Sequence, residues 1–308
     1  MTQIYVPRKK PVQLAKDFRK VPKSKQALDN HCLMVKYDGC YAYGIVNDDC
    51  AQNGAIYSRT GKPVTSLDHI GDKLRDLSKM VSPVVLIFEV VAEDMEINEI
   101  SGRFRKKTEQ FTEAFGVLHD CIPYHDFDFG ECDVPFETRY DTLKFLFLEG
   151  PLVNWDEFKM AKAYECTGVE LAYEFADAVI EKGGEGAIVK DLSADWVAGR
   201  KTEVTIKIKR EVSYDLQVIG VYGGRRGKYE GTLGGLYVHW LTGGTKEGDP
   251  VQLPVSGMSD AQRAAWWRDP RMIIGQIVKV DAMGLSAHGL LREPRFKEVR
   301  TDKDTPDL

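Results

Sequence analysis

The chain has 308 residues, of which 43% are hydrophobic and 29% are charged. This length and composition exclude a disordered or fibrous protein and predict two compact domains, each with a core of its own. The net charge of −5, from 42 Lys and Arg against 47 Asp and Glu, excludes an overall basic surface, so a polyanion would have to bind at local basic patches.

Targeting and redox signals are weak. No run approaches eighteen apolar residues, and the opening MTQIYVPRKKPVQL lacks the apolar core of a signal peptide. The six cysteines show no C-x-x-C pair and no nearby histidine pattern, so we expect reduced thiols and neither a zinc site nor disulfides. These features predict a cytoplasmic protein with no membrane segment.

The first two thirds of the chain mix strand and helix patterns. Short apolar or alternating runs bounded by Gly, Asn and Asp predict strands, among them HCLMVKY, YAYGIV, AIYSRT and SPVVLIFEVVAED. Apolar residues at helical spacing predict helices over 67–80, 137–150 and 168–182, and the strands EGAIVKD and EVTIKIKR follow the last of these. The mixture predicts an α+β domain with antiparallel sheets over residues 1–211.

After Arg210 the pattern changes. Short strands such as DLQVIGVYGG, GGLYVHWLTGG and GQIVKVDAMG are separated by Gly-rich turns, and SDAQRAAWWRD predicts one amphipathic helix. Five strands and a helix within about a hundred residues are typical of an OB-fold β-barrel. We therefore expect an OB-fold domain over residues 212–308.

The motif K-Y-D-G places Lys36, Asp38 and Gly39 together inside an otherwise apolar run. K-x-D-G alone should occur by chance in a chain of this length at roughly the 5% level. Lys36 is therefore either a strand-end lysine with its amine in water or a nucleophile.

Other polar residues in apolar strands point to a ligand. Glu89 lies within LIFEVVAED and Glu185 opens EGAIVKD; a carboxylate is costly to bury unless it binds a cation or a hydrogen-bond donor. Lys207 and Lys209 share one face of TIKIKRE, where they would repel each other unless they face an anion such as a phosphate. The alternatives are carboxylates turned outward and an edge strand kept soluble by lysines.

In their order and rough spacing, these stretches and SRTGK, which contains Arg59, resemble the covalent nucleotidyltransferases: ATP-dependent DNA ligases, RNA ligases and mRNA capping guanylyltransferases. RRGKYEGTLGGLYV and LREPRFKEVRTDK resemble the barrel and the closing R-x-P-x-F…R-x-D-K element of an ATP-dependent DNA ligase. The resemblance covers essentially the whole chain and is to the minimal ligases carried by bacteriophages, which implies the cytoplasm of an infected host.

The resemblance implies a role for each matching residue. Lys36 would take AMP from ATP, Asp38 would aid a later hydroxyl attack, and Glu89 and Glu185 would bind Mg²⁺ or Mn²⁺. Phe127 would stack on adenine, with Tyr124 and Phe129 as rivals. The nucleotide contacts implied are the backbone at Met34 and Val35, then Tyr37, Tyr41, Arg59, Glu89, Phe127, Lys190, Lys207 and Lys209, with Arg292, Arg300 and Lys303 at the leaving pyrophosphate.

This sequence departs from the family pattern at two positions. Tyr41 stands where the family usually has an arginine two residues after the motif glycine, so the phosphate contact of that arginine is absent or supplied elsewhere. Glu298 stands where larger relatives often carry arginine.

The resemblance implies a monomer that uses ATP to seal nicked duplex DNA. Two basic loops, at 102–107 and 223–228, are the candidate DNA contacts, unless they are ordinary solvated loops; their residues are Arg103, Arg105, Lys106, Arg225, Arg226 and Lys228. The alternatives are an RNA ligase, a GTP-using capping guanylyltransferase, or a non-catalytic OB-fold protein that binds nucleic acid. An NAD-dependent ligase is disfavoured because only 35 residues precede Lys36.

Overall fold

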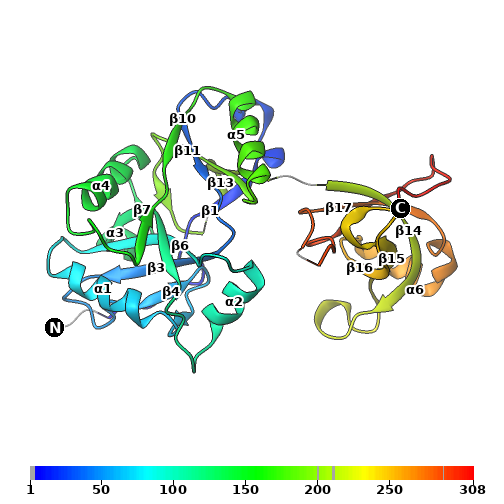
Figure 1. Cartoon of the computed structure of the whole chain (residues 1–308), viewed down its shortest axis with the longest axis horizontal. Coiled ribbons are helices and arrows are strands. Elements are labelled where there is room, and N and C mark those ends of the chain that lie inside the picture. The colour runs from blue at the N-terminus through cyan, green and yellow to red at the C-terminus, as the bar shows by residue number, and fades with distance from the viewer. Residues whose placement is uncertain (1–3, 200, 210–211, 287) are drawn as a thin grey trace. The chain divides into compact units, whose positions relative to one another are not determined.

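The chain forms two compact units, Met1–Ile208 and Lys209–Leu308 (Figure 1). The structure is a computed structural model that describes residues 4–199, 201–209, 212–286 and 288–308. The expected domain boundary at 211–212 falls on residue 211, which lies outside the described residues. Each unit has its own core and is described separately.

The larger sheet of the first unit has the strand order β5-β4-β3-β6-β7-β9. Neighbouring strands are antiparallel except β7 and β9, which are parallel. Alternate residues of the central strand β6 enter two cores: Phe88 packs among the residues under α1, α2 and α4, and Ile87 packs into an aromatic core on the opposite face. The strands are β3 (Cys40–Val46), β4 (Ile56–Ser58), β5 (Pro63–Val64), β6 (Val84–Val91), β7 (Phe115–Pro123) and β9 (Phe158–Met160).

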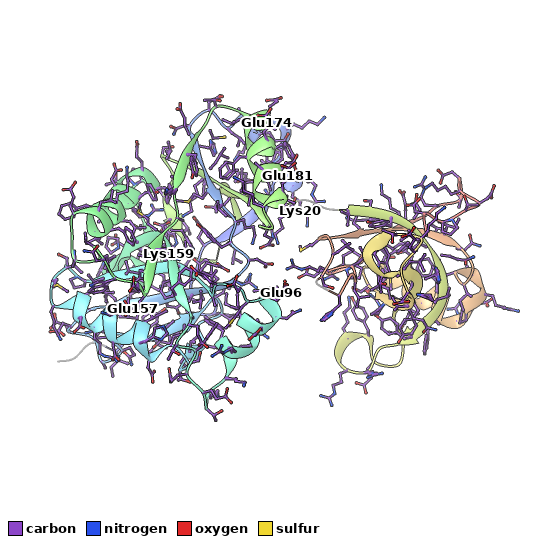
Figure 2. The ribbon with its side chains drawn as sticks, viewed as in Figure 1. Lys20, Glu96, Glu157, Lys159, Glu174 and Glu181 are labelled. Atoms are coloured by element: carbon purple, nitrogen blue, oxygen red, sulfur yellow. The ribbon has the colours of Figure 1, made fainter. Side chains whose placement is uncertain are left out.

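The smaller sheet has the order β1-β13-β11-β2-β10; β1 pairs with β13 in parallel, and β2 pairs with β10 and with β11 antiparallel. Helix α5 (Val169–Glu181) covers one face: Ala172 and Ala176 are buried, while Glu174 and Glu181 are exposed (Figure 2). On the other face, Met34 joins the core that contains Phe88, so the two sheets share that core. The strands are β1 (Leu14–Asp17), β2 (His31–Val35), β10 (Ala163–Cys166), β11 (Gly186–Asp191) and β13 (Lys201–Lys209).

The second unit is an antiparallel sheet with the order β16-β15-β14-β17-β18. Its two edge strands meet where Phe296 N donates to Ser256 O at 2.7 Å, so the sheet curls toward closure. Helix α6 (Asp260–Arg268) begins with a capping box in which Ser259 and Gln262 exchange hydrogen bonds. The strands are β14 (Val212–Gly223), β15 (Leu233–Leu241), β16 (Pro250–Val255), β17 (Ile277–Ala282) and β18 (Arg295–Val299).

The sequence predicted most of the helices correctly. The helices expected at 67–80, 137–150, 168–182 and around 259–269 are α1 (Asp68–Ser78), α4 (Phe136–Leu148), α5 and α6. Two were not expected, α2 (Ile97–Arg105) and α3 (Tyr124–Phe129). Residues 102–105 therefore belong to a helix and not to the predicted basic loop, because Ile100 and Phe104, four apart, bury one face of α2.

The remaining elements are short. Strands β8 (Glu131–Cys132) and β12 (Trp196–Val197) pair with each other. Single turns of 3-10 helix occur at Phe18–Lys20, Lys23–Lys25, Gly227–Tyr229, Thr242–Gly244 and Pro270–Met272. No helix among the described residues is long and apolar enough to cross a membrane.

Candidate active site

The K-Y-D-G turn connects β2 to β3 and is tied to the start of β11. Lys36 N donates to Gly186 O at 2.9 Å, which continues the pairing of β2 with β11 by one residue. This pairing brings the Lys36 ammonium onto the Glu185 carboxylate as an ion pair, with side chains 19% and 14% exposed. Two residues 149 apart in sequence, both predicted for the site, therefore meet directly.

Gly39 presses the same turn against β6. A Cβ on Gly39 would lie 2.5 Å from Val90 O and 2.8 Å from Glu89 Cγ, so only glycine permits this approach without a shift. Glu89 is the partly exposed residue between buried Phe88 and Val90. The turn is thus bordered by both predicted carboxylates, Glu185 on the smaller sheet and Glu89 on the larger.

Tyr41, which stands at the unusual position, pairs with Glu89 across the β3–β6 ladder. Its ring contacts the imidazole of His119, with 5.5 Å between the centroids. Burial raises the pKa of Tyr41 well above its usual range, and the carboxylates of Asp120 and Glu89 raise it further, against the opposing charge of Arg59. Arg59, exposed in the β4–β5 hairpin, is therefore close enough to act on this cluster.

His119 lies at a bulge in β7. The register shifts there, because Phe88 pairs with Leu118 and Ile87 with Asp120. An extra residue of this kind redirects its side chain and bends the strand. Burial, and then the Lys190 ammonium, lower the pKa of His119 to about 3, so the ring is neutral at neutral pH.

A buried ion network lies beside His119. Asp120 accepts from Arg139 Nε at 2.9 Å and from Lys190 Nζ at 3.1 Å, and Lys190 also donates to His119 O at 3.1 Å. The Lys190 ammonium lies 4.1 Å from the ring centroid of Phe136. Although burial alone would raise it, the two cations lower the pKa of Asp120 to about 2. The network joins strand β7 of the larger sheet, strand β11 of the smaller sheet and helix α4.

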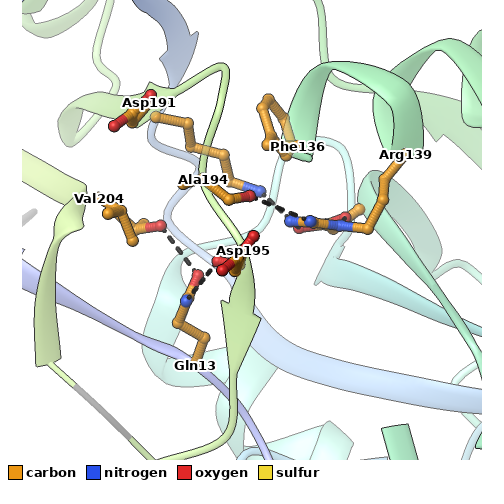
Figure 3. A pocket seen from close by; sticks show the side chains of 10 residues that line it. Gln13, Phe136, Arg139, Asp191, Ala194, Asp195 and Val204 are labelled. Atoms are coloured by element: carbon orange, nitrogen blue, oxygen red, sulfur yellow. Dashed lines mark hydrogen bonds and ion pairs between the residues drawn. The ribbon is translucent and has the colours of Figure 1, made fainter. Parts of the chain in front are cut away.

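A small polar hollow opens beside this network (Figure 3). Gln13 Nε2 donates to Asp195 O at 3.4 Å, and Thr205 Oγ1 lies 3.1 Å from Gln13 Oε1. Thr205 shares its strand face with Lys207, two residues on, because side chains alternate along β13. Lys207 pairs with Asp17 of β1, whereas Lys209 Nζ lies 3.7 Å from Met283 Sδ in the second unit.

The structure contradicts the assignment of Phe127 as the adenine-stacking ring. Phe127 is 1% exposed, and its ring is enclosed by Tyr5, Tyr43 and Trp196, so neither face is open to a ligand. Of its rivals, Tyr124 is also buried, and Phe129 is 70% exposed at the end of α3. Two other aromatic side chains lie beside Glu89: Tyr41, which pairs with it across the β3–β6 ladder, and His119, which contacts the Tyr41 ring.

The first unit also contains the predicted nucleotide contacts Met34, Val35, Tyr37 and Lys190. Met34 is buried in the shared core, and Val35 pairs with Ala187, so their backbone continues into the K-Y-D-G turn. Tyr37 packs partly against the same core. Lys190 is 6% exposed and is held by Asp120, so its ammonium is a structural link between the sheets.

Arg292, Arg300 and Lys303 all lie in the second unit. One carboxylate oxygen of Asp215 binds two of them, Arg300 Nη1 at 2.6 Å and Lys303 Nζ at 2.5 Å. Arg292 lies ahead of β18, where its carbonyl accepts from Met283 N at 2.9 Å. Glu298, the second departure from the family pattern, pairs with Lys279 across β17 and β18.

The predicted DNA contacts differ in how firmly they are held. Arg103 forms a bidentate pair with Glu113 at 2.9 and 2.7 Å, and Lys106 pairs with Glu109 at 2.7 Å. Arg105 is exposed at the end of α2, and its charge acts on the Cys40 thiol, whose pKa is raised mainly by burial. In the second unit, Arg225 and Arg226 are exposed, and Lys228 pairs with Asp260 at 2.8 Å.

Comparison with known proteins places these features in one family. Residues 12–209 match the model of the ATP dependent DNA ligase domain, and residues 225–300 match that of the DNA ligase OB-like domain. The first match alone covers more than half of the chain. The chain belongs to the ATP-dependent DNA ligases. The predicted family and the expected order of an adenylation domain before an OB-like domain are confirmed.

This chain is similar in sequence to two curated DNA ligases from archaea. It is 30% identical to one from Saccharolobus islandicus over 247 residues, which cover 74% of this chain and 39% of the relative. It is 28% identical to one from Archaeoglobus fulgidus over 198 residues, which cover 61% of this chain and 32% of the relative. The chain thus spans about a third of the length of these relatives.

Solved structures show the same fold. The structure of a Lig E DNA ligase gives a TM-score of 0.70 at 19% identity, covering 94% of this chain and 98% of that one. The ATP-dependent DNA ligase from bacteriophage T7, solved in complex with ATP, gives a TM-score of 0.54 at 20% identity. That match covers 95% of this chain and 99% of the T7 chain.

The carboxylates beside the K-Y-D-G turn are suitable ligands for a divalent cation. Mg²⁺ is commonly held by one or two carboxylates together with substrate phosphates and water. Glu89 and Glu185 supply such carboxylates on either side of the K-Y-D-G turn. Among the described residues, no group of three His, Cys, Asp or Glu side chains is placed to hold a metal ion.

Sequence reasoning missed His119, Asp120 and Arg139 of this ligase-family chain. A signal for the first two was present, since a polar pair within the apolar run FGVLHDCIP has the feature that singled out Glu89. Arg139 gave no such signal, because the apolar spacing of its helix is equally consistent with an arginine on the surface.

Proposed function

We propose that this chain is an ATP-dependent ligase that seals nicks in duplex DNA through a covalent Lys36–AMP intermediate. The observation that carries the proposal is the placement of Lys36, partly buried in a glycine-tightened turn between Glu185 and Glu89. Family membership supports ATP as the nucleotide and DNA as the substrate. Because the matched segments make up only about a third of each curated relative, the activity of the whole relative is a proposal for this chain.

In the first step, Lys36 Nζ attacks the α-phosphorus of ATP, a P–N bond forms, and the P–O bond to pyrophosphate breaks. The ammonium must lose a proton before it can attack, and a divalent cation that replaced Lys36 on the Glu185 carboxylate would favour loss of that proton to water. Lys207 and Lys209 would stabilise negative charge on the transferred phosphate, and Arg292, Arg300 and Lys303 would orient the pyrophosphate. Glu89 and Glu185 would hold Mg²⁺, which supplies charge neutralisation at the phosphates when it is bound.

In the second step, the AMP passes from Lys36 to the 5′-phosphate of the nick. In the third, the 3′-hydroxyl attacks that phosphate, a phosphodiester bond forms and AMP leaves. Asp38, two residues from the nucleophile, would orient the hydroxyl. Tyr41 and His119 would line the nucleotide site beside Glu89.

The test is covalent labelling. The protein is incubated with Mg²⁺ and ATP, GTP or NAD labelled in the nucleotide monophosphate, and an acid-stable labelled band is sought. We expect label from ATP alone, none with Lys36→Arg, and normal label with Lys182→Ala, which removes an exposed lysine at the end of α5. Label from GTP would indicate the capping enzyme, and label that persists in Lys36→Arg would refute the assigned nucleophile.

A second assay addresses the substrate. Labelled protein is mixed with duplexes that carry a nick in DNA or in RNA, and transfer of AMP and sealing are followed on a denaturing gel. We expect sealing of the DNA nick. Sealing of RNA nicks only would favour the RNA ligase, and a protein that takes no label from any nucleotide yet binds the nicked duplex would be a non-catalytic OB-fold protein.

A further inference from the structure

One face of helix α6 supports the end of the β14–β15 hairpin. This hairpin end, residues 223–232, has the sequence GGRRGKYEGT and exposes Arg225 and Arg226. Two side chains of α6 contact it: Asp260 pairs with Lys228 at 2.8 Å, and the Arg263 guanidinium lies 4.0 Å from the ring centroid of Tyr229. Both belong to one face of the helix, three residues apart.

Arg263 is buried, at 4% exposed, although it carries a charge. Its Nη1 donates to the carbonyls of Leu233 and Gly234, at 2.5 and 2.7 Å, where β15 begins. Its Nε has no hydrogen-bond partner among the residues that the structure describes, and no ion pair with a carboxylate is found for it there. Burying a guanidinium on two carbonyls and a ring costs free energy that a Leu or Met at this position would not.

The contacts of Arg263 fix the shape of the hairpin end. The carbonyls that it binds anchor the second strand, and the ring on which it lies belongs to the 3-10 turn Gly227–Tyr229. The hairpin end around that turn is closed by Thr232 N donating to Tyr229 O at 3.1 Å and by Gly224 N donating to Thr232 O at 2.8 Å. The chain is so tight that a Cβ on Gly224 would lie 1.9 Å from Tyr229 O.

The charges of this region need an anion. Arg225, Arg226, Lys228 and Arg263 bring four cations to one hairpin end and the helix beneath it, against two carboxylates, that of Asp260, which pairs with Lys228, and that of Glu230. Exposed cations held at a fixed spacing can bind the regularly spaced phosphates of a nucleic acid. Such phosphate contacts position a protein on the duplex without reading its sequence.

We propose that Arg263 is a positioning residue for DNA. Through Tyr229 and the start of β15, it holds the hairpin end so that Arg225 and Arg226 contact two phosphates of the duplex. The proposal rests on the proposed function and adds a surface and a supporting residue to it. Arg263 itself touches no DNA, because it is buried beneath the tyrosine.

The test measures binding to a nicked duplex against salt concentration. Each phosphate contact contributes about 0.9 to the slope of log affinity against log salt, so Arg225→Ala/Arg226→Ala should lower the slope by about 1.8, equal to about 12-fold between 50 and 200 mM salt. We expect Arg263→Gln to lower the slope by a similar amount, although the two loop arginines remain. The matched control is Arg268→Gln, which removes the same charge from an exposed position on α6 and should lower the slope by less than about 0.5.

A second pair of variants keeps the proposal testable if Arg263→Gln misfolds. Tyr229→Phe retains the ring and should bind as the wild type does, whereas Tyr229→Leu should weaken binding about tenfold. The control Arg268→Gln should label with ATP as the wild type does. Equal effects of Arg263→Gln and Arg268→Gln, or equal effects of Tyr229→Phe and Tyr229→Leu, would overturn the proposal while wild-type sealing remains. Failure of the wild type to label or seal would instead refute the proposed function.

Discussion

The buried network around Asp120 gives the sharpest prediction about stability. Asp120→Asn keeps the size of the side chain but removes the charge that faces Arg139 and Lys190. All three side chains are at most 8% exposed, so solvent does little to screen the loss. The two cations would remain buried without their counterion.

The magnitude follows from the pKa. The cations lower the pKa of Asp120 from 3.8 to about 2. At 1.36 kcal/mol per pKa unit, this stabilises the folded chain by about 2 kcal/mol at neutral pH. Removal of one partner of a buried ion pair commonly costs about 3 to 5 kcal/mol. We therefore expect Asp120→Asn to lower the free energy of unfolding of the first unit by about 2 to 4 kcal/mol.

The same network predicts a pH dependence. Because the pKa is lower in the folded chain, this stabilisation is complete above the unfolded pKa near 4 and is lost as the pH falls through about 2. Urea unfolding of the wild type, of Asp120→Asn and of the control Asp195→Asn, an exposed carboxylate at the same hollow, would be compared between pH 7 and pH 3. A difference below about 0.5 kcal/mol at pH 7, or a difference that does not shrink on acidification, would refute the reasoning.

Two further predictions concern the turn and the imidazole. Gly39→Ala should destabilise the first unit by about 1 to 3 kcal/mol in urea unfolding, because its Cβ would lie 2.5 Å from a backbone oxygen, whereas Gly102→Ala, with open space around it in α2, should not destabilise. Burial and the Lys190 charge should keep the His119 ring neutral down to about pH 4, so its ring resonances in NMR should titrate only near pH 3. Titration near pH 6 would mean that the ring is open to water.

Local patterns predicted the elements because each helix depends on spacing within its own segment. Leu74 and Leu77 are fully buried in α1, as the helical spacing requires. Helix α2 escaped detection because its apolar face is short and a glycine interrupts it at residue 102. The glutamates were found because a carboxylate in an apolar strand is unusual wherever the strand lies in the fold.

Positions that depend on tertiary packing were not predictable from the chain. Phe127 follows the same aromatic pattern whether its ring faces a ligand or the core, and only the packing of Tyr43 and Trp196 against it decides. The polar pair in FGVLHDCIP marks His119 as unusual, but the bulge that redirects its side chain is a property of the pairing of β6 with β7. The K-Y-D-G motif identified Lys36, but not its contact with Glu185.

The Lys36–Glu185 ion pair also bears on how substrates would enter the site. Both side chains are less than 20% exposed, so each charge is stabilised by the other and little by solvent. A nucleotide that drew Lys36 toward its phosphates would remove this stabilisation from Glu185, and a cation that bound Glu185 would remove it from Lys36. Under the proposed function, a nucleotide that already carried its divalent cation would replace both partners at once, which predicts that metal and ATP bind together more readily than either alone.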